Sequence, residues 1–273
     1  MLDTTMKFFG LKDHAFSCLP AEPYLDPPRE RAVRRIEALV HRRGFGVVSG
    51  APGTGKTALL HYLCRSLNDN HCRVTYVPFS FLEKGQLIRY IATRMGLTPT
   101  RGITGTLRLV QEHLHSLQPV NPVIVLDEVQ ELETATVHIL RSLLNDRADT
   151  AQHCTLIMAG TDSFLDQKLR LQVHEPLRQR ITLYVRLAAL DTEHTGEYIR
   201  HHLTSAGSRS DIFEPPALKL IHELVSGVPR SVGTLAEAAM DCAAEQQHQS
   251  ATLDHVNEAA ENVLPPSIPE VPQ

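Results

Sequence analysis

The sequence predicts an α/β fold with a parallel sheet, followed by a small domain made only of helices. An apolar strand, a glycine-rich loop and a helical pattern follow one another between Phe45 and Leu60. Apolar strands then alternate with helical patterns to about residue 190, after which helical patterns continue without a strand. We therefore expect four segments: an N-terminal arm (1–28), an α/β domain (29–190), a helical domain (191–264) and a disordered proline-rich tail (265–273).

The composition fits a chain with one large or two modest cores and no strong overall charge. The 273 residues are 42% hydrophobic and carry a formal net charge of −4, so contact with nucleic acid would need a local basic patch. No apolar run reaches about 18 residues, and the start has no secretory leader pattern. The five cysteines are scattered, which favours a reducing cytoplasm without zinc or disulfides. The adjacent His201 and His202 are interpreted as surface residues.

The glycine-rich loop from Gly50 to Thr57 reads G-x-x-x-x-G-K-T, a pattern that binds nucleotide phosphates. Glycines let the backbone curl and aim its N–H groups inward, and the following helix adds its positive N-terminal end. Lys56 supplies a cation for the β- and γ-phosphates, and the Thr57 hydroxyl is placed to bind Mg²⁺. A glycine turn before an ordinary helix is the alternative, which eight agreeing positions disfavour. The residues expected to bind ATP are Gly50, Ala51, Pro52, Gly53, Thr54, Gly55, Lys56, Thr57 and Ala58.

The remaining elements follow from hydrophobic periodicity and from glycine and proline stops. Further strands are expected at Arg73–Pro78, Pro122–Leu126, Cys154–Ala159 and Ile181–Val185. Helices are expected at Arg29–Arg43, Leu87–Met95, Thr106–Leu117 and Leu132–Ala148 of the first domain. Those of the second domain are Thr192–Ala206, Pro216–Val225, Ser231–Gln246 and Thr252–Val263.

Asp127 and Glu128 directly follow the apolar strand that begins at Pro122. Ligands of parallel sheets bind along the edge where the strands end, so both carboxylates should lie at that edge. Asp127 can hold Mg²⁺ opposite Thr57, and Glu128 can orient or deprotonate an attacking water. A helix-capping aspartate is the alternative for Asp127, and the glycine loop upstream argues against it.

The sequence leaves two possible roles for each of two N-terminal features. The helix Arg29–Arg43 carries Arg31, Arg34, Arg35, Arg42 and Arg43 away from its apolar face. This basic face can bind DNA phosphates, although a solvated helix surface is the more common meaning. The aromatic cluster of the arm, Phe8, Phe9 and Phe16, either packs as a lid over something or docks on the protein's own core.

The motifs together resemble AAA+ ATPases, and more narrowly the ExeA-like group related to transposon ATP-binding proteins of the MuB, IstB and TniB/TnsC kinds. The matching stretches span nearly the whole chain. They are FFGL-x-x-x-AF near the start, Gly50–Thr57, Leu126–Glu128, Ala159–Gly160, Leu177–Ile181, Tyr198–Leu203 and Gly227–Arg230. The resemblance implies a P-loop NTPase three-layer sandwich with a helical lid, and ATP and Mg²⁺ as cofactors.

The resemblance also implies roles for residues outside the two ATP motifs. Thr161 takes the sensor 1 position, although Gly-Thr-Asp departs from the family's more usual Gly-Gln and leaves Asp162 as a rival. Arg178 or Arg180 would act in trans on the ATP of a neighbouring subunit, and a surface ion pair is the alternative. Arg230, after Gly-x-Pro, takes the sensor 2 position of the lid, with a solvent-exposed arginine as the alternative.

The function that this resemblance implies is ATP hydrolysis coupled to DNA transposition. The protein would bind double-stranded DNA non-specifically as an ATP-dependent oligomer and assist a transposase. One alternative is a secretion-associated ATPase of the ExeA type. Another is a nucleotide switch that does not bind DNA.

Overall fold

The computed structural model describes residues 4–16, 22–67, 71–78, 85–132, 136, 139–140, 142–143 and 153–264. The chain divides into two compact units. The α/β unit comprises the described residues of Pro27–Pro52 and Lys56–Ala188, and the helical unit comprises those of Met1–Asp26, Gly53–Gly55 and Ala189–Gln273. Part of the predicted helix Leu132–Ala148 and the whole predicted tail 265–273 lie outside the described residues.

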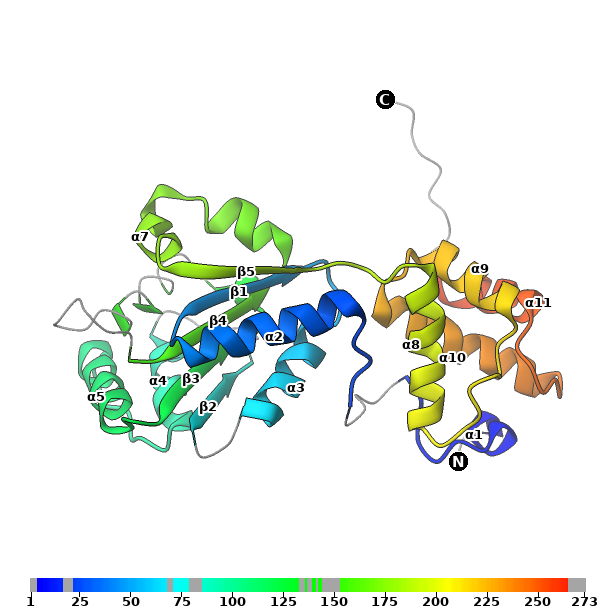
Figure 1. The fold of residues 1–273 in the computed structure, drawn as a ribbon, viewed down its shortest axis with the longest axis horizontal. Coiled ribbons are helices and arrows are strands. Elements are labelled where there is room, and N and C mark those ends of the chain that lie inside the picture. Colours follow the sequence, from blue (N-terminus) through cyan, green and yellow to red (C-terminus); the bar gives the residue numbers. More distant parts are fainter. Residues whose placement is uncertain are drawn as a thin grey trace, which may run out of the picture. The chain divides into compact units, whose positions relative to one another are not determined.

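The α/β unit is built on a five-stranded parallel sheet in the order β2-β3-β4-β1-β5, as Figure 1 shows. Its strands are β1 (Phe45–Gly50), β2 (Cys72–Val77), β3 (Asn121–Leu126), β4 (Thr155–Gly160) and β5 (Ile181–Leu187). Every residue of β1, β3 and β4 is buried, as expected of central parallel strands covered on both faces. The α/β class and all five predicted strands are confirmed, with ends within two residues of the prediction.

Helices cover both faces of the sheet because alternate strand residues point to opposite sides. Phe45, Ile124 and Met158 pack in one core with residues of α4 (Gln86–Arg94) and α5 (Ile103–Ser116). The other face meets α2 (Pro27–His41) and α3 (Lys56–Leu67), which lie in front of the strands in Figure 1. Shorter elements follow β3 and β4: η1 (Val129–Glu131), η2 (Phe164–Lys168), η3 (Gln172–His174) and α7 (Glu175–Arg178).

The helical unit contains α8 (Thr192–Ser205), α9 (Pro215–Val225), α10 (Pro229–Glu245) and α11 (Leu253–Val263). Its core is rich in alanine, with Ala236, Ala239 and Ala243 of α10 fully buried, so helices approach closely. Asp191 caps α8 by accepting a hydrogen bond from the His194 backbone N–H at 2.8 Å. In the described part of the chain, no helix has the length and apolar character that crossing a membrane requires.

The N-terminal segment is an integral part of the helical unit. It begins with α1 (Thr4–Phe9), and Phe9 and Ala15 are buried in the same core as α8 and α10. His202 Nδ1 lies 2.8 Å from the Ala15 carbonyl oxygen, and Ser208 Oγ donates to the Phe9 carbonyl at 2.6 Å. The arm is therefore docked on the protein's own helices. Because this docking buries His202, its interpretation as a surface residue is wrong.

Candidate functional site

The predicted nucleotide-binding residues gather along one edge of the sheet, where β1, β3 and β4 end. The glycine loop follows β1, Asp127 and Glu128 follow β3, and Thr161 follows β4. Because β4 lies between β1 and β3, the segment after β4 lies between the other two. After β1 the chain continues to β2 at one edge of the sheet, whereas after β4 it continues to β5 at the other edge. Open α/β sheets bind their ligands where the strand order reverses in this way.

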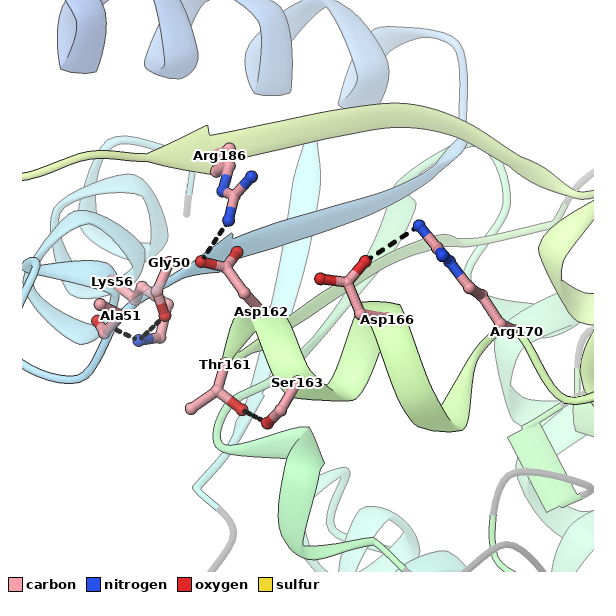
Figure 2. Close-up of polar contacts among 9 residues, drawn as sticks. All are labelled: Gly50, Ala51, Lys56, Thr161, Asp162, Ser163, Asp166, Arg170 and Arg186. Atoms are coloured by element: carbon pink, nitrogen blue, oxygen red, sulfur yellow. Dashed lines mark hydrogen bonds and ion pairs between the residues drawn. The ribbon is translucent and has the colours of Figure 1, made fainter. Parts of the chain in front are cut away.

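The glycine loop has the backbone and the cation that phosphate binding requires. Gly53 and Gly55 have φ angles of +81° and +93°, values that favour glycine and that let the chain curl before α3. A Cβ on Gly55 would meet no atom within 4 Å, so open space remains beside this part of the loop. Lys56, the first residue of α3, is buried, and its Nζ donates to the carbonyls of Gly50 at 3.0 Å and Ala51 at 3.1 Å (Figure 2). The loop thus holds one ammonium group at the N-terminus of a helix.

Thr57 and Asp127 form an oxygen pair that suits Mg²⁺. Thr57 Oγ1 donates to Asp127 Oδ2 at 2.8 Å, although the two residues come from α3 and the end of β3. A hydroxyl and a carboxylate are hard oxygen donors, and Mg²⁺ in phosphate sites takes few protein ligands besides phosphate oxygens and water. Among the described residues, no group of three or more His, Cys, Asp or Glu side chains could hold a metal ion. The residues therefore fit a magnesium site of the kind that a bound nucleotide completes.

Tyr76, next to the last residue of β2, belongs to the candidate site although no sequence motif predicts it. Its hydroxyl donates to the same Asp127 Oδ2 at 2.8 Å, and its ring packs on His61 with centroids 4.6 Å apart. Burial and the Asp127 charge raise the pKa of Tyr76, so the phenol stays protonated and remains a donor. An aromatic residue near the end of a predicted strand was the only sequence signal for this contact.

Glu128 occupies an unusual backbone position. Its φ of 52° and ψ of 40° place it in the left-handed region, where a residue with a side chain is strained, and functional sites often store such strain. The Glu128 N–H donates to Asp127 Oδ1 at 2.9 Å. Gln130 Nε2 donates to Glu128 Oε2, and Gln130 Oε1 accepts from the Thr161 N–H at 3.1 Å. Gln130 was not singled out from the sequence, where it is only a polar residue two positions after the acidic pair.

The two rivals for the sensor 1 role have different partners. The Thr161 hydroxyl lies 2.6 Å from the Ser163 hydroxyl, and Figure 2 shows both at the start of the segment after β4. Asp162 forms an ion pair with Arg186 of β5 at 2.9 Å (Figure 2). The contact between Thr161 and Gln130 connects Thr161, through its backbone, to the acidic pair. The sensor assignment to Thr161 stays a prediction.

The three candidate arginines differ in what they contact. Arg178 Nη1 donates to the carbonyls of Leu169 at 3.1 Å and Arg170 at 3.2 Å, so it supports the local turn. Arg180 is half-buried, and it lies just before β5. Arg230 is exposed on the first turn of α10, and its backbone N–H donates to the Gly53 carbonyl at 3.2 Å within the helical unit. Their catalytic roles stay predictions.

The basic face of α2 is smaller than the sequence predicts. The helix ends at His41, and Arg43 turns away with a φ of 53° to donate to the Gln118 side chain and, at 2.8 Å, to the Pro119 carbonyl. The prediction that Arg43 belongs to the basic face is therefore wrong. Arg31, Arg34 and Arg35 remain exposed on the helix, with Arg42 exposed just beyond its end. Arg34 forms a weak exposed ion pair with Glu30 at 3.5 Å.

Comparison with known proteins supports the fold. Residues 38–169 match a family model described as an AAA domain. The chain is 29% identical over 245 residues to General secretion pathway protein A of Aeromonas hydrophila, a match that covers 86% of this chain and 44% of that protein. The chain thus spans less than half the length of this relative.

Solved structures of AAA+ ATPases share the fold at low sequence identity. The Aeropyrum pernix ORC2 protein, in ADPNP–ADP complexes, matches with a TM-score of 0.70 and 17% identity over 94% of this chain and 73% of its own. Cdc6p of Pyrobaculum aerophilum matches with a TM-score of 0.72 and 19% identity over 92% and 70%. The Thermotoga maritima RuvB Holliday junction branch migration motor matches with 0.57 and 22% over 86% and 68%. With the parallel sheet and the glycine loop, these likenesses identify the fold as the P-loop fold of the AAA+ ATPases.

Proposed function

We propose that this protein binds ATP with Mg²⁺ and hydrolyses it to ADP and phosphate. The observation that carries the proposal is the 2.8 Å hydrogen bond between Thr57 Oγ1 and Asp127 Oδ2. Thr57 directly follows Lys56, and Asp127 directly precedes Glu128. Phosphoryl transfer needs a cation on the phosphates, oxygen ligands for a metal and a carboxylate for the attacking water. One edge of the sheet supplies all three.

Each residue has a separate task in this proposal. Lys56 binds the β- and γ-phosphates when it leaves the carbonyls of Gly50 and Ala51. Thr57 and Asp127 hold Mg²⁺, which would neutralise charge that develops on the phosphate oxygens. Glu128 orients the attacking water and accepts its proton. Tyr76 keeps Asp127 in place through its hydroxyl.

The first experiment measures ATP affinity and phosphate release by the full chain, with Mg²⁺ and with a chelator. Lys56→Ala should abolish measurable binding, because the phosphates lose their cation. The exposed Lys219→Ala, which removes a cation from α9, is the matched control and should bind as the wild type does. An unchanged ATP affinity in Lys56→Ala would contradict the site assignment.

We also propose that ATP promotes self-assembly, with an arginine reaching the ATP of the neighbouring subunit. Arg178 and Arg180, which lie just before β5, are both candidates for this arginine, and Arg230 would respond to nucleotide from the lid. Mixing Glu128→Gln subunits with subunits carrying both Arg178→Ala and Arg180→Ala should restore hydrolysis, because mixed interfaces combine an intact base with intact arginines. Repeating the mixture with each single arginine variant shows which residue matters. Absence of recovery in confirmed assemblies would contradict action in trans.

For the biological role, we propose non-specific binding of double-stranded DNA through α2, in support of a transposase. The exposed Arg31, Arg34 and Arg35 supply the positive charge, and a repeated patch on an oligomer gains avidity without new contacts. Solved structures with the same fold include Drosophila ORC bound to DNA, with 20% identity and a TM-score of 0.65. The exposed arginines are suited to phosphates, which position a protein on DNA without reading its sequence.

The DNA experiment measures anisotropy of a labelled duplex with a slowly hydrolysed ATP analogue across a salt series. Each phosphate contact should add about −0.9 to the slope of log affinity against log salt. Reversing Arg34 and Arg35 to Glu should weaken binding and spare ATP affinity. The control reverses the charge of two exposed residues elsewhere, Arg94 of α4 and Arg108 of α5, and makes the same change of charge. An equal loss of DNA affinity in both variants would contradict α2 as the DNA-binding surface.

The second candidate is an ATPase of general secretion. It is favoured by the match to General secretion pathway protein A, which extends over 86% of this chain. For both candidates we propose the cytoplasm as the location, because ATP is available there. Absence of DNA binding at low salt with the analogue present would favour secretion or a nucleotide switch over transposition.

A further inference from the structure

The Gln130 side chain forms a bridge between Glu128 and the segment after β4. Its amide nitrogen donates to Glu128 Oε2, and its amide oxygen accepts from the Thr161 N–H at 3.1 Å. Only one orientation of an amide can serve a carboxylate at one end and an N–H at the other. Neither Glu nor an apolar residue of similar length can make both contacts.

The surrounding residues hold this bridge in place. Lys168 Nζ donates to the Gln130 carbonyl and, at 3.0 Å, to the Leu132 carbonyl, which ties η1 to the end of η2. Val129 is fully buried beside it. Gly160 leaves the necessary space, since a Cβ there would lie 3.0 Å from Gln130 Oε1 and 2.8 Å from Val129 Cγ2. These contacts fix the Gln130 backbone and leave space for its side-chain amide.

Glu128 needs such support because its backbone alone does not fix its carboxylate. The residue lies in the left-handed region, where strain persists only if the surroundings maintain it. Its backbone N–H is bound to Asp127, and its side chain is held by Gln130. A neutral donor such as an amide can orient the carboxylate and leave its negative charge in place. A cation close by would neutralise that charge.

We infer that Gln130 is a positioning residue that holds Glu128 in the geometry for ATP hydrolysis and links it to Thr161. This inference rests on the proposed ATPase function and adds a residue to its machinery. Gln130 is not proposed to touch the phosphates or the metal ligands. It acts only through the orientation of Glu128.

The test compares Gln130→Met, of similar length but without amide hydrogen bonds, with the wild type in steady-state ATP hydrolysis. We expect kcat to fall about tenfold or more, while ATP affinity and the unfolding midpoint change little. The kcat of Gln130→Glu should fall at least as far, because a second carboxylate repels Glu128. Gln167→Met, on the exposed side of η2, is the matched control and should retain the wild-type rate.

A double-mutant cycle separates positioning from a general structural role. If Gln130 acts through Glu128, adding Gln130→Met to Glu128→Gln should leave the residual rate unchanged. A further loss of the same size in the double variant would overturn the inference, as would a Gln130→Met rate equal to or above that of the wild type. A wild-type protein that binds ATP but does not turn it over would instead overturn the proposed function, and the inference with it.

Discussion

The two units of this chain are organised by contacts of different range. In the α/β unit, the residues proposed to bind and hydrolyse ATP lie within two positions of a strand or helix end, and the parallel sheet brings Lys56, Asp127 and Thr161 to the edge where its strands end. In the helical unit, the N-terminal segment completes the core from the other end of the chain. Thr5 donates to Asp241, 236 positions away, at 2.6 Å. The α/β unit thus gathers the proposed ATP-binding residues, whereas the long-range contacts of the helical unit stabilise its core.

The largest effect on the helical unit should come from Gly227→Ala. Gly227 has a φ of +66°, and a Cβ there would lie 2.0 Å from the Leu190 carbonyl oxygen, so the backbone must shift. We expect a loss above about 4 kcal/mol in the free energy of unfolding of this unit. Hydrogen exchange of α9 and α10 amides, followed by mass spectrometry, measures it.

Gly10→Ala is the control for backbone strain alone. Its φ is +70°, but a Cβ there would meet no atom within 4 Å. We expect a loss of about 1–2 kcal/mol. Equal protection of α9 and α10 in the two variants would contradict the close approach at Gly227.

The next largest effect should come from Phe9→Ala, which tests the N-terminal segment as part of the helical core. Phe9 is 7% exposed, and truncating a buried phenylalanine costs about 3–5 kcal/mol. Exchange should accelerate in α8 and α10, which are remote in sequence. The exposed Lys7→Ala on the same short helix should have little effect. Loss of protection confined to residues 4–16 would show a loosely attached arm.

These contrasts explain how much the sequence could predict. The strands and the two ATP motifs were found because each is a local pattern, an apolar run buried on both faces or a loop with fixed spacing. The Gln130 bridge could not be found, because it depends on the order of β3, β4 and β1 in the sheet. The docking of the arm on His202 spans 187 positions and leaves no local signal.

The extent of the basic face was overestimated for a related reason. Helical periodicity continues through Arg42 and Arg43 in sequence, but the helix ends at His41, and the chain turns at Arg43. Helix ends are the least certain part of a sequence prediction, because the turn that closes a helix depends on tertiary partners. Here those partners are Gln118 and Pro119.

A smaller effect should follow from pH at the contact between the arm and α8. Burial lowers the pKa of His202, so the folded state binds a proton less readily than the unfolded state, whose histidine pKa is about 6.5. Stability of the helical unit should therefore be full above that value and fall as the pH decreases through it. Unfolding midpoints at pH 7.5 and 5.5 measure the effect.

His202→Gln keeps a donor for the Ala15 carbonyl and removes the titration at this position. The difference between the two midpoints should shrink in this variant, with the remainder assigned to groups such as His255, whose pKa burial also lowers. An undiminished difference would mean that His202 does not report on the docked arm.

The smallest effect should be loss of the cap at Asp191. Asp191→Ala should cost about 1 kcal/mol, whereas Asp191→Asn keeps an oxygen for the His194 N–H and should cost little. The hydrogen bond from the His194 backbone lowers the pKa of Asp191, so its contribution is present above the ordinary carboxyl pKa and is lost as the pH falls through the folded-state value. Unfolding midpoints between pH 6 and pH 3 measure this, and equal losses in the two variants would exclude a capping role.

Measuring both ATP affinity and turnover in Glu128→Gln tests the proposed hydrolytic site most directly. This change keeps the size of the side chain and removes the charge that accepts the proton from water. We expect ATP and Mg²⁺ to bind with nearly wild-type affinity, while phosphate release falls about 100-fold or more. Turnover within a few-fold of the wild type would contradict the role of Glu128 and the catalytic edge built around it.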